Sequence, residues 1–367
     1  MFTINGSSFP YFRSRQMTVK PVSHNYHHRY LSTVVKASIS ASPPQEQIAH
    51  DSLAGDHWEA FKKHVSGEWD GYGAEFTNSG EPRELPSAVV PEAFREWDVQ
   101  LYDWQTQCPT IAEENLYYRL IRLLPTVGCE ADAATQYSTD ERCTGNAESG
   151  VEFLSYHDNG SYVAVWPGKR VLREDFGSQS SAKNYAWVGD EQESFEIEHC
   201  FVHEKQCKFR VRVLQQIHLK SIESDSNKLP VLKNITVQRE KWESEFRNGE
   251  SLGSCSTSGS AFATSQSLHI PELTGLWHCE TFSTSSEPTG VQPLSYMGTE
   301  EEEREIPINI LPLPKGLWSE INVLDDGRFT LAAGWLVNRD SAITSIVQFS
   351  SSGKTKIACM KFKNRIH

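Results

Sequence analysis

Two short segments of the chain share one pattern, and this repeat constrains the fold more than any other feature. Residues 65–69 (VSGEW) and 273–277 (LTGLW) both place a glycine two positions before a tryptophan, and each is followed by a phenylalanine and then Glu-Pro. A glycine allows the backbone to turn tightly as it enters a strand. The indole that follows can then close one end of a small barrel. Two copies therefore predict two barrels in one chain.

The remaining apolar residues mostly alternate or come in short runs broken by Gly, Pro, Asn and Asp. Short strands at this spacing indicate an antiparallel sandwich or barrel. Helical signal is confined to residues 56–65, where Asp56 can cap a short helix. Residues 246–268 are rich in Ser, Gly and Thr, which is typical of a flexible linker. We therefore expect an all-β chain with a short N-terminal helix and two antiparallel barrels in tandem, at 56–245 and, smaller, at 269–367.

Residues 1–44 differ in composition from the rest of the chain. They hold five Lys or Arg residues, no Asp or Glu, and many Ser and Thr. This composition predicts a plastid transit peptide, because a secretory signal needs an unbroken apolar stretch that does not occur here. Mitochondrial import is the alternative, but the segment has weak helical amphipathicity. No second apolar signal follows, so the expected address is the chloroplast stroma.

The charge of the remaining chain excludes several kinds of partner. Without residues 1–44, 30 Lys and Arg stand against 48 Asp and Glu, a net charge of −18. Nucleic acid and anionic membranes should repel such a body. No run approaches the roughly 18 apolar residues of a membrane span, so any membrane contact would be peripheral, for example at the thylakoid surface. Eight cysteines without a repeated spacing argue against a disulfide scaffold.

Residues 195–217 carry the clearest local pattern. Apolar residues alternate with Glu196, Glu198, Arg210 and Arg212, as period-2 strands require. A turn at 204–205 would place Glu198 opposite Arg210 and Glu196 opposite Arg212. One interpretation is a solvated charge ladder on the barrel exterior, each pair contributing roughly 0.2–1 kcal/mol. The other is that the polar face lines the lumen, where it would bind the carboxylate of a fatty acid or the propionates of a tetrapyrrole through bidentate hydrogen bonds.

Aromatic residues supply further candidates. Trp69 and Trp277 are expected to close the two barrels, where a ligand would touch them only from inside. Tyr118 and Trp166 are candidates for the wall of a pocket. These positions complete a predicted ligand site in the first barrel.

Metal binding and catalysis have little support in the sequence. His199, His203 and Cys207 suggest zinc, but four residues of strand separate the two histidines by about 13 Å. The chain lacks a Gly-x-Ser-x-Gly elbow, a phosphate-binding loop, a dinucleotide fingerprint and a His-Glu-x-x-His helix. No catalytic residue, metal ligand or established cofactor is therefore predicted.

Gly-x-Trp at the start of an all-β unit resembles the calycin superfamily, which includes lipocalins, fatty-acid-binding proteins and chromophore lyases. Residues 57–61 (HWEAF) and 67–71 (GEWDG) more specifically resemble the opening of the domain of unknown function 3598 family of cyanobacteria and plant plastids. The similarity continues, in order, at residues 195–198, 209–213, 313–314, 329–331 and 334–336. The resemblance implies two calycin-like antiparallel β-barrels and a plastid address. It implies no reaction, because the family has no established catalytic residues to transfer.

Together these observations predict a stromal protein that binds a hydrophobic or tetrapyrrole-like small molecule in support of photosynthesis or plastid stress protection. The expected ligand-site residues are Arg210, Arg212, Glu196, Glu198, Trp69, Tyr118 and Trp166. One alternative is a non-catalytic assembly protein whose barrels are filled and whose acidic surface docks a basic protein partner. Another is an isomerase or lyase that acts within a barrel. Residues 343–347 carry no cation, so the first barrel is the expected site for any anion.

Overall fold

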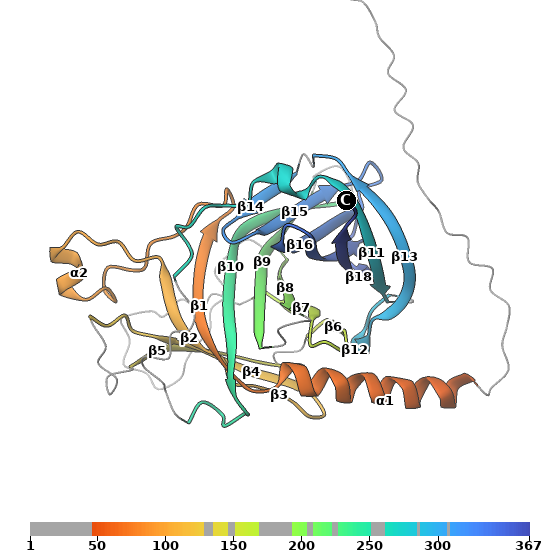
Figure 1. The fold of residues 1–367 in the computed structure, drawn as a ribbon, viewed down its shortest axis with the longest axis horizontal. Helices are drawn as coiled ribbons and strands as arrows, with labels where there is room; N and C mark the ends of the chain where they lie inside the picture. Colours follow the sequence, from red (N-terminus) through yellow and green to blue (C-terminus); the bar gives the residue numbers. More distant parts are fainter. Residues whose placement is uncertain are drawn as a thin grey trace, which may run out of the picture. The chain divides into compact units, whose positions relative to one another are not determined.

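The structure is a computed structural model that describes nine segments of the chain. These are residues 46–127, 135–145, 151–168, 193–203, 208–221, 227–250, 261–284, 287–306 and 309–367, with side chains from residue 55 onward. The predicted transit peptide, residues 1–44, lies outside the described residues. Among the described residues, most of the backbone lies in two β-sheets, with few helices (Figure 1).

The first sheet has eleven strands in the described part of the chain. In chain order they are β1 (Glu68–Thr77), β2 (Asp103–Gln107), β3 (Thr110–Ala112), β4 (Leu116–Leu123), β5 (Gln136–Cys143), β6 (Phe153–Tyr156), β7 (Tyr162–Pro167), β8 (Ser194–Val202), β9 (Phe209–Ser221), β10 (Lys228–Ser244) and β12 (Gly290–Pro293). Their spatial order is β12-β6-β7-β8-β9-β10-β1-β2-β4-β3, with β5 beside β4. Neighbours are antiparallel except β12, which runs parallel to β6. The sheet is curled like half a barrel (Figure 1).

The second sheet has seven strands in the described residues. They are β11 (Gly275–Ser283), β13 (Ser295–Arg304), β14 (Ile310–Leu313), β15 (Leu317–Val323), β16 (Phe329–Asn338), β17 (Ser341–Phe349) and β18 (Thr355–Arg365). Their order is β13-β11-β18-β17-β16-β15-β14, so each sheet keeps two unpaired ends in the described residues. The prediction of a mostly β chain with two sheet units is confirmed, whereas closed tandem barrels remain a prediction.

The helices are α1 (Glu46–Val65), α2 (Glu92–Glu96) and the 3-10 helix η2 (Ile270–Leu273). The predicted helix at 56–65 is therefore present but begins ten residues earlier. Its last turn carries Lys62, Lys63 and His64, where positive charge suits the negative end of the helix dipole. Phe61 and Val65 are fully buried in a cluster with side chains of the first sheet. This end of α1 therefore covers part of the curled sheet.

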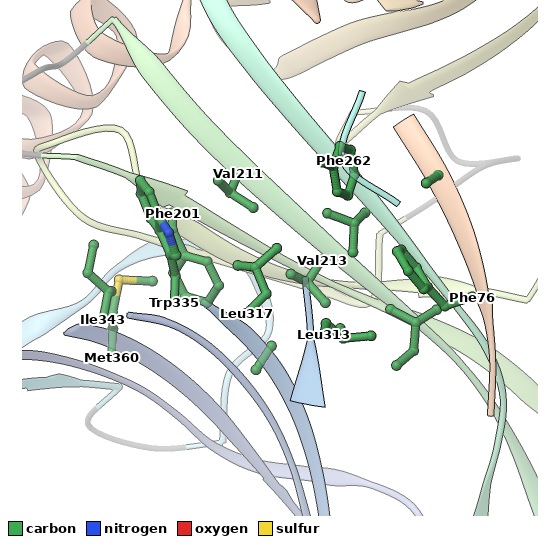
Figure 2. Packing of buried hydrophobic residues seen from close by; sticks show 14 of the residues in the cluster. Phe76, Phe201, Val211, Val213, Phe262, Leu313, Leu317, Trp335, Ile343 and Met360 are labelled. Atoms are coloured by element: carbon green, nitrogen blue, oxygen red, sulfur yellow. The ribbon is translucent and has the colours of Figure 1, made fainter. Parts of the chain in front are cut away.

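One face of the first sheet packs against the second sheet (Figure 2). Phe201, Val211 and Val213 lie on this face of β8 and β9, and they join Trp335 and Met360 of the second sheet in a single core. Burying each such side chain contributes about 1.5–3 kcal/mol. The predicted period-2 alternation at 195–213 is thus confirmed. Its apolar face is the one that the second sheet covers.

The segment at 246–268 is only partly linker-like. Phe262 and Ala263 are buried in the core shared by the two sheets, and both backbone N–H groups donate to Asp103 Oδ1, at 2.8 and 3.0 Å. Residues 251–260 lie outside the described residues. The domain boundaries 56–245 and 269–367 stay predictions. β12 belongs by sequence to the second predicted domain, yet it pairs with β6 in the first sheet.

The repeated Gly-x-Trp pattern produces the same geometry twice. Trp69 Nε1 donates to the carbonyl of Val65 at 2.9 Å, and Trp277 Nε1 donates to the carbonyl of Leu273 at 3.1 Å. Both indoles are buried, as expected of residues that close a barrel end. In each copy the indole therefore ties the first strand to the carbonyl four residues before it, at the end of the preceding helix.

The glycines of the repeat make room for a large neighbour. Gly67 has φ 145° and Gly275 has φ 114°, values that side-chain-bearing residues rarely adopt. A Cβ on Gly67 would lie 2.1 Å from Trp242 Nε1, and one on Gly275 would lie 2.9 Å from Arg365 Nη1. The Arg365 guanidinium in turn lies over the Trp277 ring, 4.3 Å from its centre.

Candidate functional site

The concave face of the first sheet carries a buried ionic cluster. Arg210 and Arg212 of β9, Glu198 of β8 and Glu240 of β10 are all 1% exposed or less. The interpretation as a solvated charge ladder is therefore wrong. Because the second sheet covers the apolar face of these strands, their polar face points into the half-barrel, where the charges must pair with one another.

The predicted strand register is also wrong. Glu198 lies opposite Leu214 and Glu196 lies opposite Gln216, four positions beyond the arginines expected there. The hairpin is centred two residues later than the turn at 204–205 would place it, and residues 204–207 lie outside the described residues. Arg210 instead lies opposite Glu240 on β10, a partner that the sequence reasoning missed.

Glu240 is the centre of the ionic cluster. Its Oε2 accepts hydrogen bonds from Arg210 Nε at 2.7 Å and Arg212 Nε at 2.9 Å, and its Oε1 accepts one from Arg212 Nη2 at 2.7 Å. Burial alone would raise the pKa of Glu240, but the two guanidinium groups outweigh it and lower the pKa to about 2. Glu240 is therefore ionised at any physiological pH.

Glu198 neutralises the second positive charge. Its carboxylate accepts hydrogen bonds from Tyr118 Oη at 2.6 Å, Tyr162 Oη at 2.7 Å, Trp166 Nε1 at 2.8 Å and Arg212 Nη1 at 3.1 Å. Burial opposes ionisation, yet Arg212, Arg142 and the two phenols lower the pKa of Glu198 below its usual value. With two arginines and two glutamates, the cluster is electrically neutral.

Aromatic rings cover the guanidinium groups. Arg210 lies 4.2 Å from the centre of the Trp69 ring, and Arg212 lies 4.7 Å from that of Tyr118. Stacking of this kind stabilises a desolvated cation by about 0.5–2 kcal/mol. Arg142 of β5 lies 5.2 Å from the centre of the Trp166 ring.

The structure thus brings the seven predicted site residues into one connected group. Glu198 contacts Arg212, Tyr118 and Trp166 directly, and Glu240 links this group to Arg210, which lies over Trp69. Glu196 joins through Arg142, to which it is hydrogen-bonded and which stacks on Trp166. Sequence reasoning missed Glu240, Arg142 and Tyr162. Glu240 is two residues from Gln238 on β10. Alternate residues of a strand share a face, so this spacing places both side chains on the polar face of the sheet.

A small cavity lies at one end of the cluster. Its volume is about 50 Å³, and its lining includes three arginines, two carboxylates, Gln238 and two leucines: Arg122, Arg142, Arg212, Asp140, Glu196, Leu120 and Leu214. A protein site for a whole ligand usually occupies about 300–1,000 Å³. At about 10–15 Å³ for each water-sized group, this cavity holds roughly three to five heavy atoms. It therefore has room for one functional group of a ligand, and not for an entire tetrapyrrole.

Arg142 is the most unusual residue of this cavity. One of its terminal nitrogens, Nη2, donates to Glu196, whereas the other, Nη1, is buried and has no hydrogen-bond partner among the described residues. Gln238 Oε1, also in the lining, is likewise buried without a partner in that part of the chain. A buried polar group without a partner costs about 1–3 kcal/mol, more if it is charged. The wall of the cavity therefore contains a guanidinium with one hydrogen-bond donor still without a partner among the described residues.

The histidines considered for zinc lie on the other face of the sheet. His199 is fully buried, its Nε2 is 3.3 Å from Gln215 Oε1, and burial lowers its pKa to about 4. The His203 ring contacts that of Trp335, 6.1 Å away. Cys207 lies outside the described residues. Within the described ranges, no group of three or more His, Cys, Asp and Glu side chains is arranged to hold a metal ion.

These features define a class: a β protein with a curled sheet, a covering second sheet and a neutral ionic cluster in the concave interior. Among solved structures, the chain is similar to a protein of unknown function from the DUF3598 family of Nostoc punctiforme, with 16% identity and a TM-score of 0.45. The similarity covers 84% of this chain and 99% of the other. No protein-family model and no curated protein matches the chain. No helix in the described residues is long and apolar enough to cross a membrane.

Proposed function

We propose that this chain is a stromal, calycin-like plastid member of the domain of unknown function 3598 family that binds a hydrophobic or tetrapyrrole-like carboxylic acid. The bound molecule would serve photosynthesis or plastid stress protection. The observation that carries the proposal is Arg142, which lines a small cavity and whose buried Nη1 has no partner among the described residues. The family and the address rest on the sequence motifs and on the composition of residues 1–44.

A carboxylate is the group that best fits this donor. A guanidinium N–H forms a short, charge-assisted hydrogen bond to a carboxylate oxygen, about twice as strong as a neutral one. Arg210 and Arg212, the residues first expected to bind an anion, already donate to Glu240 and Glu198. We therefore assign the anion-binding role to Arg142, with Arg122 in the same lining.

The size of the cavity decides how such a ligand would bind. A volume of about 50 Å³ accepts a carboxyl group and the first carbons of a chain or propionate. Leu214, Gln216 and Asn234 in the lining are partly exposed, so the cavity reaches solvent on their side. The apolar body of the ligand would lie beyond this rim, and only its acid group would enter the half-barrel.

A calorimetric titration with hexadecanoate, its methyl ester and protoporphyrin IX tests the proposal. The acid should bind once per chain, and the ester, which has the same body without the charge, should bind at least tenfold more weakly. Arg142→Lys keeps the positive charge beside Glu196 but removes Nη1. It should weaken acid binding by roughly tenfold to a hundredfold, the equivalent of a charged hydrogen bond of about 1.5–3 kcal/mol. Arg328→Lys, at an exposed pair with Asp326, is the matched control and should bind normally.

A second candidate function is a non-catalytic assembly protein with a filled interior. It is favoured by the neutral, fully paired cluster that occupies the half-barrel beside the cavity. In that case no acid binds in the titration. Protein purified from plastids would then yield no pigment or lipid by absorbance and mass spectrometry, and it would carry a basic partner protein instead.

A further inference from the structure

A second, larger pocket lies at the opposite end of the same concave face, and we propose that it binds a planar aromatic anion. The end of α1 contributes Lys62 and Lys63 to it, and β10 contributes Trp242, while Lys208 lies just before β9 and Phe246 just after β10. Its volume is about 390 Å³, within the usual range for small-molecule sites. We call this the helix-end pocket.

The floor of the helix-end pocket is a tryptophan held in one orientation. Trp242 Nε1 donates to the carbonyl of Ser66 at 3.1 Å. The indole passes directly over Gly67, where any Cβ would come within 2.1 Å of Nε1. Trp242 is only partly buried, so part of the ring remains accessible. A fixed aromatic surface of this kind favours stacking with a flat ring.

Positive charge surrounds this aromatic floor. Lys208 Nζ lies 4.6 Å from the centre of the Trp242 ring. Lys63 and Lys208 are exposed, and neither makes an ion pair within the described part of the chain. Lys62 is paired with Glu59 at 2.8 Å, and Glu245 is the one acidic residue among the described residues that line the pocket. Two lysines without an ion pair among the described residues, in an acidic protein, give this pocket a local preference for anions.

These features select a ligand of one chemical class: an aromatic ring system that carries a carboxylate, sulfonate or phosphate. The ring would lie on Trp242 and Phe246, and the anionic group would contact Lys63 and Lys208. This site is independent of the Arg142 cavity. Lys208, directly before β9, lines one site and Gln216 of β9 lines the other; they are eight residues apart, or roughly 26 Å of extended chain.

Two fluorescent probes with related aromatic systems test the inference. 8-Anilinonaphthalene-1-sulfonate carries an anionic group, and N-phenyl-1-naphthylamine does not. The sulfonate should bind once per chain, and the neutral probe should bind at least tenfold more weakly. The double variant Lys63→Gln/Lys208→Gln should weaken sulfonate binding by about tenfold, which corresponds to two partly screened charges of about 0.7 kcal/mol each. Lys220→Gln, an exposed lysine at the far end of β9, is the matched control.

Three results would overturn the inference: equal affinity for both probes, sulfonate binding that the double variant leaves unchanged, or several equivalent sulfonate sites. Because both lysines are exposed, the double variant should fold, and circular dichroism checks this directly. Arg142→Lys should leave sulfonate binding unchanged. If that variant binds hexadecanoate more weakly but binds the sulfonate normally, the two sites bind their ligands independently.

Discussion

Replacing Glu240 with glutamine tests the buried ionic cluster most severely. The variant has nearly the same shape but leaves Arg210 and Arg212 with Glu198 as their nearest remaining countercharge. Three hydrogen bonds to the Glu240 carboxylate, of 2.7 to 2.9 Å, lose their ionic character. Removing one partner of a buried ion pair typically costs about 3–5 kcal/mol.

The lowered pKa of Glu240 indicates how the stabilisation by this carboxylate depends on pH. The folded protein lowers this pKa from 4.5 to about 2, and a shift of about 2.5 units corresponds to about 3 kcal/mol at neutral pH. Since the folded pKa is the lower one, the stabilisation is complete above pH 4.5 and is lost as the pH falls towards 2. The loss caused by Glu240→Gln should thus be about 3–5 kcal/mol at pH 7 and smaller by roughly 1 kcal/mol at pH 3.5.

Urea denaturation followed by far-ultraviolet circular dichroism measures both values. Glu300→Gln is a suitable control, because Glu300 is more than half exposed and pairs with Lys361 at 2.7 Å. That variant should lose less than about 1 kcal/mol. A loss in Glu240→Gln no larger than that of the control, or one that does not shrink at acidic pH, would refute the reasoning.

Three further predictions concern the glycines, the contact between the sheets and the cysteines. Gly67→Ala should lower the free energy of unfolding by about 2–4 kcal/mol, and Gly275→Ala by less, because the atoms facing a new Cβ are closer at Gly67; equal losses in urea titrations would contradict this. Gln215→Leu should cost about 1–3 kcal/mol in the same assay, because it breaks the hydrogen bonds from β9 to the second sheet; a neutral result would mean that they do not matter. Burial raises the pKa of Cys108 to about 11 and of Cys200 to about 12, so at pH 8 both should resist iodoacetamide until the chain unfolds, as mass spectrometry would show; rapid labelling of the folded protein would contradict this.

The sequence was sufficient to predict the strands around Glu198 and Arg212 and the burial of both tryptophans of the Gly-x-Trp repeat. Alternation shows which residues share a face, and the structure keeps those groups together on β8 and β9. It does not show which face is buried. That depends on the second sheet, whose first strand begins 63 positions after Arg212, so the sequence alone is compatible with a charged face in solvent or in the interior.

The sequence pattern around Glu240 and Arg142 did not identify them as members of the cluster. Glu240 lies in a run of polar residues in which Arg239, on the opposite face, is also charged, so alternation gives no contrast there. The guanidinium of Arg239 lies over the Phe209 ring at 5.0 Å, which explains why a cation is tolerated on the apolar face. Arg142 follows two acidic residues in a strand that is mostly exposed, a pattern typical of a solvated strand.

The carboxyl signal of [1-13C]hexadecanoate, followed by NMR as the pH is lowered in the presence of the protein, tests the central claim most directly. If the acid group enters the cavity beside Arg142, one bound signal per chain should appear with a pKa below that of the free acid, since a guanidinium at hydrogen-bond distance favours the ionised form. At the same ligand concentration, the bound signal should be much weaker in Arg142→Lys. A bound carboxyl group that titrates as it does in solution, or one that is indifferent to Arg142→Lys, would contradict the account.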